Sequence, residues 1–232
     1  MRNIAIIPAR GGSKRIIKKN IKLFYGKPII GWAIEAAEKS GLFEKIVIST
    51  DCKEIAQISR SLGGEVPFTR PDNISDDHSS VIEVIRHAIK FYETNKETFE
   101  LATLIYPTAP LIKKRDLVQA VSLINKYDFA MSVTSYSYPI QRALELSERE
   151  NTIRMIQPKN FTKRSQDLPK CYHDAGQFIV GKTESWNKKN PIVDGNTLAI
   201  VVPKTRAQDI DEEEDWLEAE FKFSSIMKRD KV

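Results

Sequence analysis

The sequence of 232 residues predicts an α/β fold built on one doubly wound, mainly parallel sheet. Short apolar runs and amphipathic helical patterns alternate along the first 136 residues. Hydrophobic residues make up 41% of the chain, as in ordinary globular proteins, and the length suffices for one large domain with a substantial core. We therefore expect a single domain over residues 1–232.

The first elements predict a β-α-β unit. Residues 3–8 read as a buried strand, residues 28–41 as a helix closed by Gly41, and residues 45–51 as a second buried strand. The alternation then continues. We expect a helix over 52–64, a short strand over 65–70, a helix over 79–95, a strand over 101–107, a helix over 113–126 and a strand over 128–136.

The alternation fails between residues 139 and 170. This segment is polar, weakly patterned and punctuated by Pro139, Pro158 and Pro169, so it predicts an arm that leaves the main sheet with at most short strands. Regular order returns with strands expected over 172–182 and 198–204. A helix over 211–227 follows, with acidic residues in its first turn, where the helix dipole favours them.

Charge is distributed unevenly along the chain. The net charge is +5 and the isoelectric point is near 9.0, which favours polyanionic partners without choosing among nucleic acids, anionic membranes and phosphorylated small molecules. Residues 1–34 hold eight Lys or Arg and no acid, whereas residues 209–215 hold six acids in seven positions. Two solvated faces would explain this pattern, and so would a site that joins an anion to a metal.

Cysteines and apolar runs bear on location. Cys52 and Cys171 form neither a C-x-x-C pair nor a ligand cluster, so we expect free thiols in a reducing cytoplasm. The first apolar run, residues 4–7, is too short for a signal peptide, and no stretch approaches the ~20 apolar residues of a spanning helix. We expect a soluble protein without a membrane partner.

The stretch IIPARGGSKRIIKKN, residues 6–20, is the first candidate site. It lacks both the P-loop motif and the G-x-G-x-x-G fingerprint. However, Gly11 and Gly12 follow a strand, their backbone amides can approach an anion, and Arg10 and Lys14 flank the bend. Because sites in doubly wound sheets lie beyond the carboxyl ends of the strands, a phosphate cradle is favoured over a solvated loop.

Asp209 and Asp211 are the candidate metal ligands. In an extended segment they point to the same side, where they can share a divalent cation. Mg²⁺ prefers one or two carboxylates together with phosphate oxygens and water, so this pair needs a phosphorylated substrate. The alternative is that these acids only cap and solubilise the last helix; we accept that alternative for Glu212, Glu213 and Glu214.

The histidines and the serines before the helix over 79–95 have ordinary explanations. His78, His87 and His173 show no metal-binding spacing, and His87 is expected to be structural. Ser80 and Glu83 have the spacing of a capping box, with a nucleobase contact from Ser79 and Ser80 as the less favoured alternative.

Seven short motifs follow one another along the chain: IIPARGGSKRIIKKN, STD, TRP, DDHSS, YPTAP, RSQDLP and DID. Taken together and in this order, they resemble the cytidylyltransferases that make CMP-activated nine-carbon acidic sugars. The opening motif of that family, A-R-x-x-S-K-x-x-x-x-K-N, is filled at every fixed position. The resemblance implies a Rossmann-like nucleotidyltransferase domain, with residues 139–170 as an inserted arm that pairs two subunits into a homodimer.

The resemblance also implies roles for individual residues. Arg10, Lys14 and Lys19 would bind the triphosphate of CTP, Asn20, Arg70 and Ser80 would surround cytosine and ribose, and Arg164 would lie near the sugar carboxylate or the phosphates. Asp209 and Asp211 would hold Mg²⁺. We take Arg10, Lys14, Lys19 and Asp211 as catalytic, and complete the substrate-binding set with Ala9, Gly11, Gly12, Ser13, Ser79, Tyr106 and Gln177. Arg15 and Lys18 are left as solvated charges.

The identity of the sugar rests on departures from the sialic-acid branch of that family. YPTAPLI stands where that branch has Q-P-T-S-P-L-R, so Tyr106 replaces a Gln that faces the sugar and Ile112 replaces an Arg. A missing polar partner favours a less hydroxylated sugar. The stretch RSQDLPKCYHDAGQF resembles pseudaminic acid cytidylyltransferases most, with N-acetylneuraminic and legionaminic acid as alternatives.

The resulting hypothesis is transfer of CMP from CTP to the anomeric hydroxyl of the sugar acid, with release of pyrophosphate. One rival is a glycosyltransferase that uses the DID stretch as a D-x-D metal site, which leaves the motif of residues 9–20 unexplained. The other rival is a basic RNA-binding module, which has no RNP-like motif in its support, so we expect no nucleic-acid partner.

Overall fold

A computed structural model describes the chain except residues 78, 189–191, 193–195 and 230–232, so His78 lies outside the described residues. The helices are α1 (Ile30–Ser40), α2 (Lys53–Ser61), α3 (Val81–Thr94), α4 (Lys114–Leu123) and α5 (Glu213–Arg229). The strands of the main sheet are β1 (Asn3–Pro8), β4 (Lys45–Ser49), β5 (Leu101–Ile105), β6 (Phe129–Ser135), β9 (Tyr172–Lys182) and β10 (Thr197–Val201).

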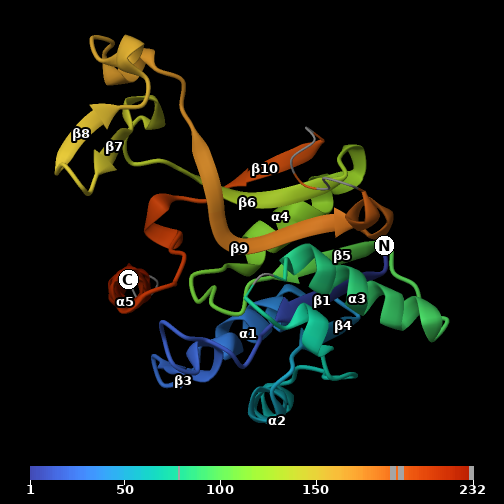
Figure 1. Cartoon of the computed structure of the whole chain (residues 1–232). Coiled ribbons are helices and arrows are strands. Elements are labelled where there is room, and N and C mark those ends of the chain that lie inside the picture. Colours follow the sequence, from blue (N-terminus) through green and yellow to red (C-terminus); the bar gives the residue numbers. More distant parts are fainter. Residues whose placement is uncertain (78, 189–191, 193–195, 230–232) are drawn as a thin grey trace.

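The main sheet is mixed but mainly parallel, as the sequence predicted. Its six strands run in the order β10-β6-β9-β5-β1-β4 (Figure 1). β1 pairs in parallel with β4 and β5, and β10 pairs in parallel with β6. The exception is β9, which lies antiparallel between β5 and β6.

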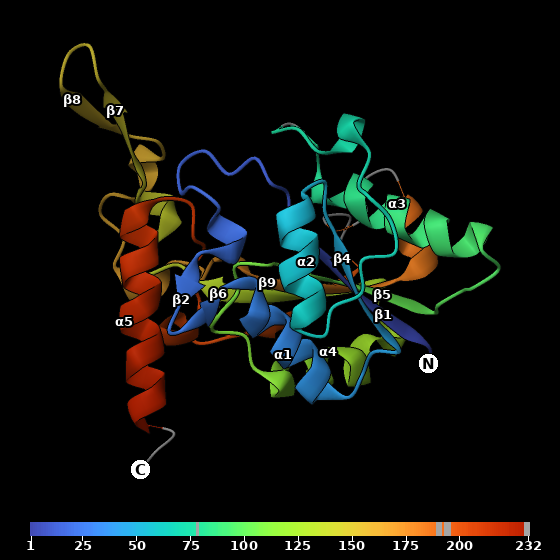
Figure 2. The same cartoon turned by 90° about the horizontal axis from the view of Figure 1, so that it is seen from below.

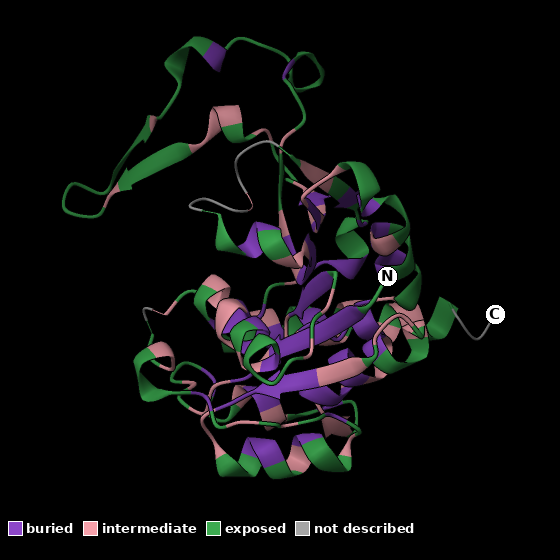
Figure 3. Cartoon of the chain, turned by 90° about the vertical axis from the view of Figure 1, so that its right-hand side faces the viewer, coloured by how far each residue is buried: buried purple, intermediate pink, exposed green. Residues whose placement is uncertain are grey.

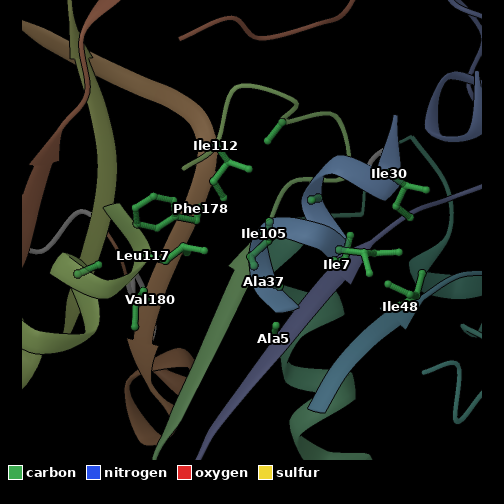
Figure 4. Packing of buried hydrophobic residues seen from close by; sticks show 14 of the residues in the cluster. Ala5, Ile7, Ile30, Ala37, Ile48, Ile105, Ile112, Leu117, Phe178 and Val180 are labelled. Atoms are coloured by element: carbon green, nitrogen blue, oxygen red, sulfur yellow. The ribbon is translucent and has the colours of Figure 1, made fainter. Parts of the chain in front are cut away.

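Helices cover both faces of this sheet, and β1 shows why its sequence is apolar throughout. Ala5 and Ile7 point into a cluster with α1 and α4, part of which is seen in Figure 4, whereas Ile4 and Ile6 point into a second cluster with α3. A strand buried on both faces needs an unbroken apolar run. No helix in the described part of the chain is both long and apolar enough to cross a membrane.

The short strand predicted over residues 65–70 is wrong. Only Glu65 pairs with the sheet, through an isolated bridge to Val47 at the outer edge of β4. Pro67 has no N–H to donate to a ladder, so the chain leaves the sheet after one pairing. The segment then turns back, and the amide of Arg70 donates to the carbonyl of Thr50 at 2.8 Å.

A third cluster joins the two ends of the chain. The small hairpin of β2 (Leu23–Phe24) and β3 (Lys27–Pro28) places Phe24 against α5, with ring centroids 5.5 Å from Trp216 and 5.3 Å from Phe223. Ile16 and Ile210 are buried in the same cluster. Figure 2 shows α5 beside β2. This packing brings the basic loop after β1 to the acidic segment before α5.

Residues 139–170 form the arm that the sequence predicted. Its two strands, β7 (Leu144–Ser147) and β8 (Thr152–Met155), pair only with each other within the described chain. Figure 1 shows this hairpin standing away from the main sheet, and Figure 3 shows that it is mostly exposed. Its sequence breaks the alternation because it does not contribute to the main core.

Candidate functional site

A cavity of about 360 Å³ lies where the loops after β1 and β5 meet the segment before α5. Most of the predicted site residues line it: Arg10, Ser13, Lys14, Lys19, Asn20, Arg70, Ser79, Tyr106, Asp209 and Asp211. These residues come from five separate stretches of the sequence. This position agrees with the expectation that the site lies at the carboxyl ends of the strands.

The loop after β1 is held in place by its neighbours. The carboxylate of Asp51 accepts the amide of Gly11 at 2.8 Å, and Asn20 donates to the carbonyl of Arg10 at 3.0 Å. A Cβ on Gly11 would lie 2.9 Å from the Cβ of Cys52, which is closer than real side chains approach. Gly11 thus permits close packing against the loop after β4, and its amide is already engaged.

Arg10 and Lys14 share a carboxylate that the sequence analysis did not assign. Arg10 Nη1 lies 2.5 Å from one carboxylate oxygen of Asp77, and Lys14 Nζ lies 2.5 Å from the other. The hydrogen bond from Lys14, followed by that from Arg10, lowers the pKa of Asp77. Asp77 therefore pairs, in the present structure, with two of the three cations that we expected to bind phosphate.

Two further cations of the cavity, Lys19 and Arg15, meet Asp211. Lys19 Nζ lies 3.2 Å from Oδ1 of Asp211 and donates to the carbonyl of Ile210 at 2.5 Å, and Arg15 Nη2 lies 2.9 Å from Oδ2. Arg15, which the sequence left as a solvated charge, is 59% exposed, but it also lines the cavity and pairs with Asp211. Lys18 pairs with Glu54 at 2.7 Å and does not line the cavity.

Asp209 and Asp211 face the same cavity. The fully buried Ile210 between them points into the third cluster, so the alternation of an extended chain turns both carboxylates the other way. Surrounding protein atoms, and then the charge of Asp211, raise the pKa of Asp209. Burial also raises the pKa of Asp211, but Lys19 and Arg15 outweigh it and the pKa lies below its ordinary value.

This donor pair suits a metal that completes its shell elsewhere. Among the described residues, no group of three or more His, Cys, Asp or Glu side chains is arranged to hold a metal by itself. Nor does any Lys or Arg of the described chain form an ion pair with Asp209. Two carboxylates that need phosphate oxygens and water to finish the shell fit the preference of Mg²⁺.

Arg70 is the most deeply buried cation of the cavity. It is 4% exposed, and its guanidinium donates to the hydroxyl of Ser49 at 3.1 Å and to the carbonyl of the same residue. Burial lowers the pKa of Arg70 to about 10, although the charge of Asp51 opposes this. The side chain therefore stays cationic at neutral pH while the end of β4 fixes it.

Six predicted residues do not line the cavity: Ala9, Gly11, Gly12, Ser80, Arg164 and Gln177. Ser80 caps α3, accepting the amide of Glu83 at 3.3 Å, and Glu83 accepts the amide of Ser80 at 2.9 Å, so the predicted capping box is confirmed. Arg164 lies on the arm and pairs with Asp167 at 2.8 Å. Gln177 is buried in β9 and donates to the carbonyl of Arg206.

Sequence reasoning missed three acids in or beside the cavity. Asp76 and Asp77 lie within the DDHSS stretch, where only His78 and the serines were considered. Asp174 lies in β9, and its Oδ2 accepts the hydroxyl of Tyr106 at 3.3 Å. The signal for Asp77 was a pair of acids directly before a capped helix that begins beside the sheet edge. Nothing local marks Asp174, which only the antiparallel placement of β9 brings to Tyr106.

Known proteins resemble this chain over almost its full length. The family model described as "Cytidylyltransferase" matches residues 4–193. A pseudaminic acid cytidylyltransferase of Campylobacter jejuni subsp. jejuni serotype O:2 is 41% identical over 213 residues, which are 91% of each chain. An N-acylneuraminate cytidylyltransferase of Escherichia coli O18:K1:H7 is 31% identical over 92% of this chain and 50% of its own length.

A solved structure shows the same fold at low sequence identity. It is that of CMP:2-keto-3-deoxy-manno-octonic acid synthetase complexed with CTP, with a TM-score of 0.70, 15% identity, and coverage of 97% of this chain and 99% of the other. The chain belongs to the cytidylyltransferase family.

Proposed function

We propose that this cytidylyltransferase transfers CMP from CTP to the anomeric hydroxyl of pseudaminic acid. The observation that carries the proposal is one cavity that joins the cations of residues 10–19 to Asp209 and Asp211. The choice of sugar is supported by the 41% identical relative, which is named for pseudaminic acid, and by Tyr106, which stands where a sugar-facing Gln is expected in the sialic-acid branch.

The reaction is an in-line displacement at the α-phosphorus. The anomeric oxygen of the acceptor forms a bond to phosphorus, and the bond to the oxygen shared with the β-phosphate breaks with its electron pair on pyrophosphate. The hydroxyl proton passes to water. Positioning and charge neutralisation are the main tasks of the protein in such a reaction.

The residues of the cavity match these tasks. Arg10, Lys14 and Lys19 would bind the phosphates and balance the charge that develops on pyrophosphate. Because these cations already pair with Asp77 and Asp211, an incoming triphosphate would take the place of the two carboxylates. Arg70, held by Ser49, would present a fixed cation toward the nucleotide.

We further propose that Asp209 and Asp211 hold Mg²⁺. When bound, Mg²⁺ would offset phosphate charge and make the acceptor hydroxyl more acidic. The two carboxylates would orient the phosphate oxygens around it. For this exchange Asp211 would give up its ion pairs with Lys19 and Arg15, which would then be free to contact phosphate.

A pyrophosphate-release assay tests the proposed function. CTP and Mg²⁺ are incubated with pseudaminic, legionaminic or N-acetylneuraminic acid in parallel, and we expect the highest rate with pseudaminic acid. Preference for another acid would contradict the choice of sugar, and release with none of them would contradict the proposed activity. Consumption of a nucleotide sugar without CTP would instead support the D-x-D glycosyltransferase. Retention of single-stranded RNA on a filter, if it weakens as the salt concentration rises, would support the RNA-binding module.

Substitution of Asp211 tests the metal ligands. We expect Asp211→Asn to lower kcat for pyrophosphate release by about 100-fold or more at millimolar Mg²⁺. Glu214→Gln is the matched control, because Glu214 lies in the exposed first turn of α5 and does not line the cavity. Equal turnover in Asp211→Asn and the control would contradict the metal assignment. Binding of Mn²⁺, followed by electron paramagnetic resonance, gives a readout that does not depend on turnover.

We propose that the reaction with CTP takes place in the cytoplasm. Cys52 and Cys171 are both free thiols, as expected for a protein of a reducing compartment. We also propose that two subunits pair through the arm, since it exposes Leu144 and Ile153 on its hairpin and Phe161 after it, with nothing packed over them in the described chain.

A further inference from the structure

A cavity of about 390 Å³, which we call the basic cavity, lies between the start of α4, the residues after β10 and the end of α5. It shares no lining residue with the cavity of the candidate site, the site cavity. Five cationic side chains line it: Lys113, Lys114, Arg115, Arg206 and Arg229. Its described lining contains no acid. Positive charge gathered in a hollow attracts anions.

The charges at the start of α4 oppose the dipole of that helix. Lys113 is the N-cap residue and its side chain makes no capping hydrogen bond, and Lys114 and Arg115 are the first two helical residues. A helix start carries partial positive charge, so Ser, Thr, Asp or Asn is preferred at the cap and acids in the first turn. These three cations therefore destabilise the start of α4, and an anion bound beside them would offset this effect.

Asp116, the acid in the first turn of α4, lies beside the basic cavity and is already engaged. Nη1 and Nη2 of Arg206 donate to separate oxygens of Asp116, the second at 3.2 Å. Arg115 approaches the same carboxylate at 3.8 Å. One carboxylate shared in this way cannot balance the five cations, so the basic cavity keeps an excess of positive charge.

Arg206 points independently to a polar occupant. The residue is only 6% exposed, and its Nε has no hydrogen-bond partner among the described residues. Buried N–H groups in native proteins are rarely left without an acceptor. Because Arg206 lines the basic cavity, an oxygen-rich ligand bound there would supply the missing acceptor.

Two cations of the basic cavity are available for such a ligand. The side chains of Lys114 and Arg229 form no ion pair or hydrogen bond with any described residue. Arg229 ends α5, where a cation is favoured by the dipole, so its position has an ordinary explanation. Lys114 has no such explanation. Guanidinium and ammonium groups that surround a helix start are the usual ligands of phosphate.

The basic cavity lies between two segments that also carry site residues. Residues 106–108 line the site cavity and precede α4, whereas Asp209 and Asp211 follow Arg206 in the segment before α5. The ion pair of Arg206 with Asp116 joins these two segments within the chain. An anion held by Lys114 on one side and by Arg229 and Arg206 on the other would join them a second time.

We propose that the basic cavity binds a phosphate group, as inorganic phosphate, pyrophosphate or a small phosphate ester, at a place separate from the site cavity. Lys114, Arg115 and Arg229 supply the charge, and Arg206 donates its Nε. The bound phosphate group holds the start of α4 to the residues that precede Asp209. Binding needs no turnover, so it does not depend on the proposed reaction.

Equilibrium dialysis with labelled pyrophosphate, in the presence of a chelator, tests the proposal. We expect the double variant Lys114→Gln, Arg229→Gln to bind one pyrophosphate fewer per chain than the wild type, because the site cavity is left intact. The double variant Lys90→Gln, Lys126→Gln is the matched control. It removes the same charge from exposed positions that line neither cavity, and it should bind as many as the wild type.

Thermal unfolding gives a second readout. Pyrophosphate at ten times its Kd should raise the melting temperature of the wild type by about 3 °C more than that of the Lys114→Gln, Arg229→Gln variant. Potassium chloride of the same ionic strength controls for screening. Equal binding by variant and wild type, or an equal rise in melting temperature, would overturn the proposal. A variant that melts several degrees lower without any anion would also contradict it, since these cations would then serve the fold itself.

Discussion

At the scale of single residues, four cations of the candidate site share two carboxylates. Asp77 bridges Arg10 and Lys14, and Asp211 bridges Arg15 and Lys19. Both groups are open to solvent, where such pairs are weak and exchange readily. A triphosphate with its bound cation supplies negative charge for the Lys and Arg side chains and positive charge for the carboxylates. Each ion pair can therefore be replaced by contacts with the substrate and its cation, and no charged side chain is left without a partner.

Asp77 should therefore compete with the triphosphate. We expect Asp77→Asn to lower the KM for CTP about two- to fivefold, because Arg10 and Lys14 no longer have to leave a carboxylate. Asp72→Asn, an exposed acid of the same loop that does not line the cavity, is the control. Initial rates over a range of CTP concentrations measure the effect. A higher KM in Asp77→Asn would instead show that Asp77 assists binding.

Asp174 gives a prediction about pH. Burial raises its pKa, although the amide of Gly176 and the hydroxyl of Tyr106 act against this. Since the folded state holds the proton more tightly, the wild-type fold loses stability as pH rises through the interval between the ordinary pKa of a carboxyl and the raised one. Below that interval the group is protonated in both states and costs nothing.

We therefore expect Asp174→Asn to melt at a higher temperature than the wild type at pH 7, with the difference shrinking as the pH falls toward 4. The amide oxygen of Asn can still accept from Gly176, so the geometry is kept. Thermal unfolding at several pH values measures this, with the exposed Glu150→Gln as control. A difference that grows in acid would show that ionised Asp174 stabilises the fold.

At the scale of elements, most of the architecture follows from local patterns. The alternation of apolar runs and amphipathic segments predicted the positions of helices α1 to α5 and of the six strands of the main sheet. It did so because each of these elements buries one or two of its faces against a neighbouring element. The strand predicted over residues 65–70 does not form, and the reason is local: Pro67 has no N–H with which to continue the hydrogen bonding of the sheet. The antiparallel direction of β9 left no mark in its own apolar pattern, since both directions bury the same side chains.

Substitution of Ser80, at the start of α3, distinguishes a capping role of this residue from a role in substrate binding. We expect Ser80→Ala to lower the free energy of unfolding by about 1 kcal/mol through loss of the cap, with the KM for CTP unchanged. Urea unfolding and initial rates measure the two quantities. Ser61→Ala, at the exposed end of α2, is the control. A higher KM for CTP with little loss of stability would instead support the nucleobase contact.

At the scale of the whole molecule, the arm is the part that the core does not explain. Ile153 and Leu146 are 65% and 56% exposed, although apolar side chains on a two-stranded hairpin gain stability only when something covers them. A second copy of the chain is the partner that the resemblance to the family implies. The main sheet, in contrast, buries its apolar residues within one chain.

Substitution in the arm tests this pairing. We expect light scattering after size exclusion to give the mass of a dimer, and Ile153→Asp to give that of a monomer, because a buried unpaired charge is costly in an apolar interface. Val118→Asp, exposed on α4 in the main body, should remain dimeric. A wild-type monomer, or a dimer that survives Ile153→Asp, would contradict pairing through this face of the hairpin.

The sequence by itself determined the α/β class, the position of the arm and half of the residues that line the site. These features depend on periodicity and on short motifs, which are local properties of the chain. Only the tertiary structure decided that Asp77 and Arg15 belong to the site, that Gly11 serves packing, and that β9 brings Asp174 to Tyr106. The physical reason is that each of these contacts joins residues far apart in sequence, through packing such as that of Phe24 against α5, which no local pattern records.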